Sequence, residues 1–218
     1  VTRRKYAAQV SLLDDAIGQT LEALRQTEQD RNTLVFFFSD NGGPITKNGS
    51  NNAPLRGGKG DVYEGGVRVP FVVRWPARFR SGSKYEFPVS SLDVFATSLA
   101  AADVQMPSDR KYDTANLIPY LSGERTGPPH DDLFWRNGPR QGIRDGGWKL
   151  VETGPNATSL YELQADVGES QDRLAEQAEV AMRLKQKLDA WDAEMIPPAF
   201  PGATGRANRK TAAPSGGR

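Results

Sequence analysis

The 218-residue sequence contains no cysteine, and this absence removes several kinds of chemistry at once. Disulfide bonds, thiolate metal sites and a cysteine nucleophile are all excluded within the chain. A run of ~18 apolar residues is also absent, as is a charged and then apolar leader, so the sequence predicts no membrane span and carries no targeting signal. Because the sequence opens on Val1, we expect it to begin inside a larger gene product, and the missing leader is then uninformative.

The sequence also lacks an excess of charge of either sign. It has 28 Lys and Arg residues against 27 Asp and Glu residues, and its formal net charge is +1. This balance leaves no electrostatic footprint for nucleic acid. The length suits one domain with an appendage. The sequence therefore predicts no nucleic-acid or membrane partner, and it carries no signal of oligomeric state.

Hydrophobic periodicity predicts that the chain starts as an α/β structure. Apolar residues at helical steps between positions 6 and 24 predict an amphipathic surface helix. Residues 34–38 form a continuous apolar run, which is typical of a strand covered on both faces in a parallel sheet. Residues 70–75 predict a second strand, and residues 91–102 predict a helix that Ser90 or its neighbour can cap.

The pattern changes beyond Pro107, where short apolar segments are separated by glycine and proline. These segments predict a small antiparallel sheet, with strands at 133–136, 141–144, 148–152 and 159–163. Apolar residues at helical steps from Val180 to Met195 predict a closing helix that packs on this sheet. We therefore expect an α/β part at 1–106, a sheet-and-helix subdomain at 107–197 and a disordered basic tail at 198–218.

Two oxygen-bearing side chains, Asp40 and Asn41, directly follow the first apolar strand. Asn-Gly is also a strong hairpin signal, and the dipeptide alone leaves the turn and the ligand interpretations open. The residues that follow do not read as a returning strand, and α/β sheets place ligand groups beyond the carboxyl ends of strands. Because carboxylate and amide oxygens suit calcium, with magnesium as the alternative, we expect Asp40 and Asn41 to be metal ligands.

A lysine surrounded by glycines, Lys59, follows in the same long loop. The glycines allow its backbone to approach a ligand closely. A P-loop would need glycine at Ala53 and Ser or Thr at Gly60, and GxGxxG fails at Tyr63, so neither nucleotide motif is present. We interpret Lys59 as an anion contact, with a flexible surface lysine as the alternative.

Three more residues receive structural interpretations. Glu64 and Arg68 are interpreted as braces of the loop against the sheet. His130 is the single histidine and lies in a loop before a strand. We expect its side chain to be solvated rather than catalytic.

Six sequence blocks occur together in a characteristic order: LDDAIG, NTLVFFFSDNGG, PLRGGKGDVYEGGVRVPFVVRWP, SLDVFAT, GIRDGGWKLVE and SLYEL. From Tyr6 to Trp191 they resemble the carboxyl-terminal half of the sulfatase family, particularly the arylsulfatase and N-acetylgalactosamine-6-sulfatase type. The resemblance implies a partial alkaline-phosphatase-like α/β fold and sulfate-ester hydrolysis by a formylglycine nucleophile beside a calcium ion. Asp40 and Asn41 then match two calcium ligands, and Lys59 matches the lysine that contacts the substrate sulfate.

The sequence departs from the family mainly in what it lacks. The nucleophile motif, Cys-or-Ser-x-Pro-x-Arg, is absent, as are the family's upstream calcium and sulfate ligands. Formylglycine is therefore expected only in an amino-terminal half, and the chain alone is expected to be inactive. Residues 166–169, Asp-Val-Gly-Glu, replace the usual Asp-Pro-x-Glu, which questions only a structural turn.

Two other functions stay open at this point. One is a non-catalytic remnant or interaction module that keeps the fold without the reaction. The other is a phosphoester hydrolase of the same superfold, since a metal and a lysine accept phosphate too. Family habit predicts a periplasmic or secreted location, and the natural sulfate ester is not defined by the sequence.

Overall fold

The computed structural model describes residues 2–197, so the predicted tail at 198–218 lies outside the described residues. The first half contains α1 (Thr2–Gln26), η1 (Asp30–Asn32), β1 (Val35–Phe38), α2 (Glu64–Val67), β2 (Phe71–Arg74) and α3 (Asp93–Ala101). The second half contains α4 (Ile118–Leu121), β3 (Asp132–Asn137), β4 (Arg140–Asp145), β5 (Trp148–Glu152), β6 (Thr158–Glu162) and α5 (Ala178–Glu194).

Contacts divide the described chain into two compact units. Unit 1 takes residues up to Asp40 together with Thr46–Ser50 and Val69–Asp131. Unit 2 takes Asn41–Ile45, Asn51–Arg68 and the described residues from Asp132 onward. The loop that carries Lys59 thus belongs to the same unit as the carboxyl-terminal sheet. The division predicted at 106/107 stays a prediction.

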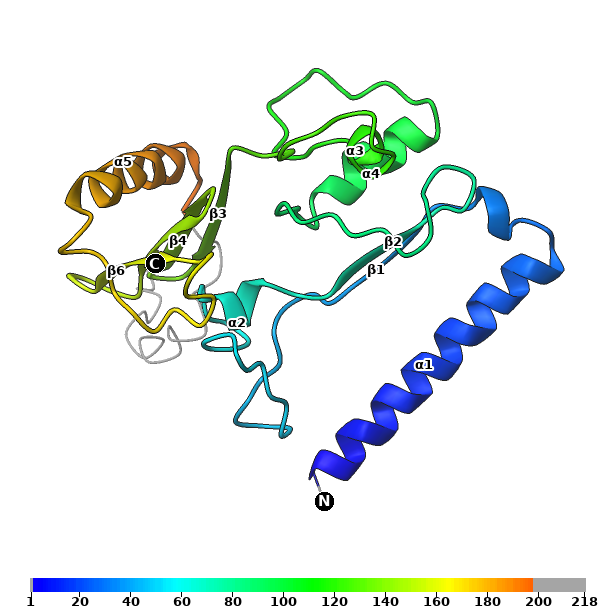
Figure 1. Ribbon diagram of the computed structural model, residues 1–218, viewed down its shortest axis with the longest axis horizontal. Helices are drawn as coiled ribbons and strands as arrows, with labels where there is room; N and C mark the ends of the chain where they lie inside the picture. Colours follow the sequence, from blue (N-terminus) through cyan, green and yellow to red (C-terminus); the bar gives the residue numbers. More distant parts are fainter. Residues whose placement is uncertain (1, 198–218) are drawn as a thin grey trace, which may run out of the picture. The chain divides into compact units, whose positions relative to one another are not determined.

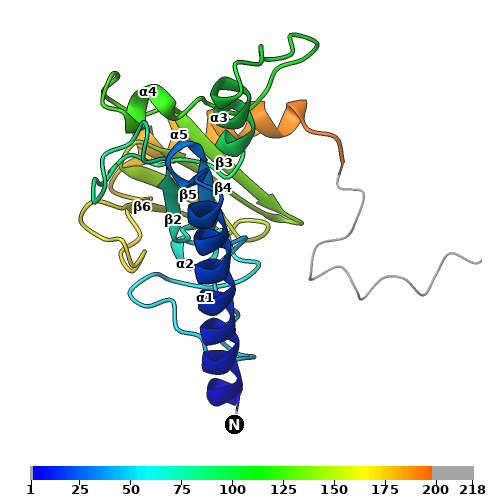
Figure 2. The same cartoon turned by 90° about the vertical axis from the view of Figure 1, so that its right-hand side faces the viewer.

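In unit 1, α1 is one uninterrupted helix, drawn in blue in Figure 1 and seen from the side in Figure 2. The predicted helix is confirmed, but none of its residues is buried. Tyr6, Val10 and Leu13, on the predicted apolar stripe, expose 37%, 48% and 52% of their surface. No helix in residues 2–197 combines the length and the apolar composition needed to cross a membrane.

The second element of unit 1 is a two-stranded sheet of β1 and β2. The strands are antiparallel, and Phe37 pairs with Val72 in register. These two residues expose 43% and 55% of their surface. The predicted positions of both strands are confirmed. The prediction that the first strand is covered on both faces in a parallel sheet is wrong for the described residues. A continuous apolar run indicates a capacity for burial, and it carries no information about the direction of the neighbouring strand.

The predicted helix at 91–102 forms as α3 and begins at Asp93. Ser90 contributes to its start, because the Ser90 hydroxyl accepts a hydrogen bond from the Leu92 N–H at 3.2 Å. The residue directly before α3 is Leu92, which makes no side-chain capping hydrogen bond. Ser90 therefore stabilises the turn that leads into α3, and the prediction that a serine caps the first turn is wrong.

Unit 2 is built on a four-stranded antiparallel sheet in the order β3-β4-β5-β6, and the predicted small antiparallel sheet is therefore confirmed. Two-residue turns connect the first three strands. Gly138 and Gly146 take the first positions of these turns with φ values of 61° and 57°. Tight hairpins of this kind need left-handed backbone, which glycine adopts without steric cost.

The two faces of this sheet are covered by different segments. On one face, α5 packs through a core of Ile143, Leu150, Leu160, Ala181, Leu184 and Leu188. The predicted packing of the closing helix on the sheet is therefore confirmed. On the other face, Val62 from the loop joins Val151, Tyr161 and Leu163 in a second buried cluster. Because successive side chains of a strand point to opposite faces, Leu150 and Val151 serve the two clusters in turn.

A group of charges ties α5 to the end of β4. Asp145 accepts a hydrogen bond from the Lys187 ammonium at 2.8 Å and another from the Arg183 guanidinium. Burial acts to raise the pKa of Asp145, but the hydrogen bonds from Lys187 and Arg183 outweigh it and hold the pKa below its ordinary value. This carboxylate therefore favours the folded state when it is ionised.

We predict that Asp145→Asn lowers the free energy of unfolding at pH 7, and that this loss of stability becomes smaller as the pH falls into the acid range. The folded pKa is depressed, so the stabilisation is present above the ordinary aspartate pKa of about 3.9 and is lost as the pH falls through the depressed value. Urea denaturation of both proteins between neutral and strongly acidic pH measures this difference. The matched control, Asp189→Asn, removes an exposed carboxylate of α5 and should change little. A difference between Asp145→Asn and the parent that is independent of pH would contradict the assignment.

Candidate functional site

Three backbone segments of unit 2 meet beside Asn41 and Lys59. The Gly42 N–H donates to the Gly66 carbonyl at 3.0 Å, and the Lys59 N–H donates to the Gly43 carbonyl at 3.3 Å. The approach is so close that a Cβ on Gly42 would lie 1.7 Å from the Gly65 carbonyl oxygen. A Cβ on Gly58, one of the glycines around Lys59, would likewise lie 2.5 Å from the Gly43 carbonyl oxygen. At this position the absence of a side chain lets one backbone segment approach another.

The side chain of Asn52 joins two of these segments. Its Oδ1 accepts from the Gly43 N–H at 3.1 Å, and its Nδ2 donates to the carbonyls of Gly43 and Gly57 at 3.0 Å each. One amide therefore links the segment after Asn41 to the segment before Lys59. Sequence reasoning missed Asn52, because a loop asparagine carries no periodic or spacing signal.

Lys59 itself is an exposed cation on a fixed backbone. The next residue, Gly60, has a φ of 92°, and its carbonyl accepts from Asn137 Nδ2 at 2.8 Å and from Arg140 at 3.0 Å. Arg140 also donates to Asp61 Oδ1 at 2.8 Å. These contacts anchor the chain beside Lys59 to the β3–β4 hairpin, and the Lys59 ammonium stays accessible to an anion.

Asp40 and Asn41 are neighbours in sequence, and the boundary between the two units falls between them. Asp40 is exposed, whereas Asn41 is partly buried, with a buried Oδ1. Together they provide two oxygen donors, and calcium takes about six to eight. Across residues 2–197 no group of three or more His, Cys, Asp or Glu side chains could hold a metal ion. Carboxylate and amide oxygens are of the kind that calcium binds, and the assignment of Asp40 and Asn41 as metal ligands stays a prediction.

The most deeply buried cation of the described residues is Lys149 on β5. Its side chain has no exposed surface, and its Nζ donates to Glu64 Oε1 at 2.7 Å. The same Nζ lies 3.1 Å from Glu169 Oε1, without hydrogen-bonding geometry. Glu169 Oε2 in turn accepts from the Glu64 N–H at 2.7 Å. We call these residues the Glu64–Lys149–Glu169 triad, and it confirms the interpretation of Glu64 as a brace between loop and sheet.

The surroundings of the triad raise the pKa of Glu169 above its ordinary value. Burial raises the pKa of Glu169, and the nearby Glu64 carboxylate adds to the increase. The Lys149 ammonium and the hydrogen bond from the Glu64 N–H oppose it. Arg68, the other predicted brace, is half exposed and lies 3.7 Å from Glu64 Oε2.

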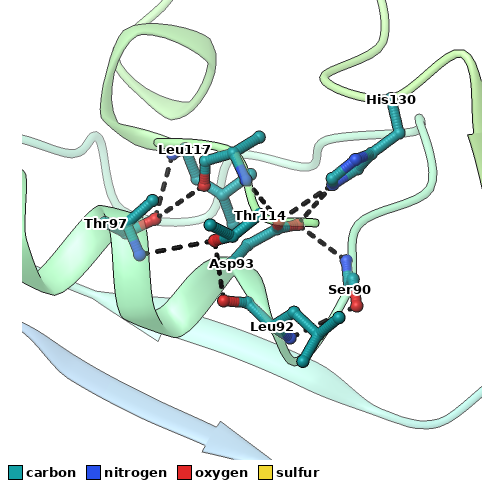
Figure 3. A network of polar contacts seen from close by, with 9 residues as sticks. Ser90, Leu92, Asp93, Thr97, Thr114, Leu117 and His130 are labelled. Carbon is teal, nitrogen blue, oxygen red and sulfur yellow. Dashed lines mark hydrogen bonds and ion pairs between the residues drawn. The ribbon is translucent and has the colours of Figure 1, made fainter. Parts of the chain in front are cut away.

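His130 lies in unit 1 and is held by a buried carboxylate (Figure 3). Its Nε2 lies 2.9 Å from both carboxylate oxygens of Asp93, which has no exposed surface. Asp93 also accepts from the backbone N–H groups of Ser90 and Ala115 at 2.7 and 2.8 Å. The expectation of a solvated histidine is wrong, because its side chain contacts Asp93. The sequence did not indicate this partner, which lies 37 residues away along the chain. The contacts give His130 a structural role.

Comparison with protein families agrees with this architecture. The model described as Sulfatase matches residues 2–104, and the one described as N-sulphoglucosamine sulphohydrolase, C-terminal, matches residues 58–194. The chain therefore belongs to the sulfatase family, of which it carries a carboxyl-terminal portion.

Individual relatives cover the chain well but extend far beyond it. The mouse steryl-sulfatase is 36% identical over 163 residues, which are 69% of this chain and 26% of that protein. The human N-acetylgalactosamine-6-sulfatase is 40% identical over 122 residues, 55% of this chain and 23% of that protein. The crystal structure of Ps i-CgsB with k-i-k-neocarrahexaose has a TM-score of 0.84 and 29% identity, and covers 93% of this chain and 46% of that one. The predicted partial alkaline-phosphatase-like sulfatase fold is confirmed.

We predict that Asp93→Ala destabilises unit 1. The substitution leaves two backbone donors and His130 without their buried acceptor, which costs about 1–3 kcal/mol of unfolding free energy. Urea denaturation followed by the fluorescence of Trp75, the one tryptophan of unit 1, measures the change. Asp103→Asn is the control, because Asp103 is exposed and asparagine tolerates its φ of 55°. Equal stabilities of the two variants would show that the Asp93 network contributes nothing.

Proposed function

We propose that this chain supplies part of the sulfate and calcium site of a sulfuric ester hydrolase of the arylsulfatase type. In this proposal Lys59 contacts the sulfate of the substrate, and Asp40 and Asn41 are two of the calcium ligands. The formylglycine nucleophile and the remaining ligands belong to an amino-terminal half. A periplasmic or secreted location is part of the same proposal and rests on family habit.

The observation that carries the proposal is the joining of the Asn41–Gly43 segment to the Lys59 segment within unit 2. Backbone hydrogen bonds and Asn52 hold the two segments together. A hard oxygen donor and a cation therefore lie on one rigid piece of chain. Membership of the sulfatase family supports sulfate as the anion.

The chain's own residues have limited chemical roles in this reaction. The Lys59 ammonium would bind a sulfate oxygen and stabilise the negative charge that grows as the S–O bond to the alcohol breaks. Calcium, when bound, would add Lewis-acid polarisation of the sulfate. No residue of the chain provides the covalent step, so the 218 residues alone should not hydrolyse sulfate esters.

The test extends the reading frame upstream of Val1, where the proposal expects an in-frame Cys-or-Ser-x-Pro-x-Arg motif. In that longer polypeptide, Lys59→Ala should lower kcat/KM for 4-nitrophenyl sulfate about 100-fold or more, because a charge-stabilising contact is lost from the transition state. Lys84→Ala, in the separate exposed loop between β2 and α3, should leave kcat/KM unchanged.

The alternatives are separated by the same assay. Faster hydrolysis of 4-nitrophenyl phosphate than of the sulfate would favour the phosphoester hydrolase. An absent motif and no turnover would favour the non-catalytic remnant or interaction module. Measurable turnover by the 218 residues alone would refute the proposed division of the site.

A further inference from the structure

The Glu64–Lys149–Glu169 triad connects three parts of unit 2 that are far apart in sequence. Glu64 opens α2 directly after the glycine loop, Lys149 lies within β5, and Glu169 lies in the turn region after β6. A second link runs beside the triad, since Arg56 donates to the Glu169 carbonyl and to the Tyr161 hydroxyl at 2.9 Å each. The loop is thus attached to the sheet near both of its ends.

The turn that presents Glu169 is itself well formed, although the sequence lacks the usual proline there. The Asp166 carboxylate accepts from the N–H groups of Ser170 and Gln171 at 2.8 Å each. Glu169 has a φ of 52°. The Glu169 carboxylate is therefore presented by a defined turn, and the departure at position 167 has not removed that turn.

A short route leads from the triad to Lys59. Glu64 is followed by Gly65, whose N–H donates to the Arg56 carbonyl at 2.7 Å and closes the loop on itself. Inside the closed loop, the Gly58 N–H donates to Asp61 Oδ2 at 3.0 Å. Lys59 lies between these contacts, so a shift of Glu64 would be passed to its backbone.

The chemistry of the triad favours a role in geometry over a role in stability. Burying an ion pair in place of well-packed apolar side chains generally adds little stability. Buried charges are satisfied only when their partners lie at defined distances and directions. The triad has two carboxylates and one ammonium. The remaining negative charge is offset by the guanidinium groups of Arg144 and Arg68, which lie 3.8 and 3.7 Å from Glu64 Oε2. Such a cluster accepts one placement of the loop and penalises others.

We propose that the Glu64–Lys149–Glu169 triad is the device that positions Lys59 for the substrate anion. Lys149 and Glu169 are positioning residues that act through Lys59 and touch neither substrate nor metal. This inference rests on the proposed function, which assigns the sulfate contact to Lys59. It predicts that loosening the triad moves the loop while the sheet keeps its structure.

The first experiment measures amide hydrogen exchange by NMR in the 218-residue chain. The variants are Lys149→Met, which removes the buried cation, and Glu169→Gln, which keeps the side-chain size. The loop amides of Gly42, Lys59 and Gly65 should exchange about tenfold faster or more, relative to the amides of the β4–β5 pairing. Lys185→Met, which removes a half-exposed cation from α5, is the control and should leave this ratio unchanged.

Two outcomes of the exchange experiment would overturn the inference. In one, the loop amides keep their protection in both triad variants. In the other, loop and sheet amides accelerate by the same factor in both variants, which would show that the triad supports unit 2 as a whole. Glu169→Gln covers the case in which Lys149→Met fails to fold.

The second experiment is a double-mutant cycle on kcat/KM in the longer polypeptide. Lys149→Met alone should lower kcat/KM for 4-nitrophenyl sulfate about tenfold or more, and it should add almost nothing to Lys59→Ala. Independent, additive losses would show that Lys149 does not act through Lys59. The exchange experiment needs neither sulfate nor turnover. Its failure therefore leaves the proposed function intact, whereas an inactive longer polypeptide refutes that function and leaves the exchange result intact.

Discussion

An ammonium group with no exposed surface must be compensated inside the fold, because removing a charge from water costs several kcal/mol even after the protein relaxes. Lys149 is such a group, and the compensation comes from outside its own sheet. One carboxylate belongs to the loop after the glycines and the other to the turn after β6. The arrangement of loop, sheet and turn in unit 2 depends on this requirement.

The glycines of the loop are required for a different reason, which is the close packing of the backbone. A Cβ on Gly65 or Gly66 would lie 2.3 or 2.2 Å from a carbonyl oxygen of the adjoining loop segment. These positions accept only a hydrogen because backbone packs directly on backbone. The close packing brings the segment after Asn41 against the segment of Lys59, and the triad then holds both near the sheet. Glycine and buried charge thus perform successive tasks in one assembly.

Local patterns in the sequence are sufficient to predict much of the fold. The sequence predicts the helices α1 and α5 and the short strands β3 to β6 because the apolar pattern of each depends on neighbouring residues. The antiparallel pairing of β1 with β2 was missed, since strand direction depends on a partner more than 30 residues away along the chain. α2 and α4, of four residues each, have too few residues for a periodic signal.

The candidate site shows the same division between local and distant information. Lys59, Asp40 and Asn41 stood out because glycines or a strand end adjoin them in sequence. The partners of His130 and Lys149 escaped prediction because Asp93 and Glu64 lie 37 and 85 residues away. A signal for Lys149 was present, since Trp148 and Leu150 flank a lysine whose strand neighbours are all apolar up to Val151. A charge in such a strand either faces solvent or requires a distant counter-charge, and the sequence alone does not decide between them.

Burial explains why Lys59 and Lys149, two lysines of one unit, differ in their capacity to bind a ligand. Lys59 is exposed on a backbone that hydrogen bonds hold in place, so its ammonium can exchange water for an anionic ligand. Lys149 is enclosed by two carboxylates and the face of Trp135, whose centroid lies 5.4 Å from its Nζ, and has no capacity left for a ligand. A cation that binds a ligand needs accessible N–H donors as well as a fixed position. In unit 2 the enclosed Lys149 fixes the position of the loop, and the exposed Lys59 keeps its N–H donors accessible.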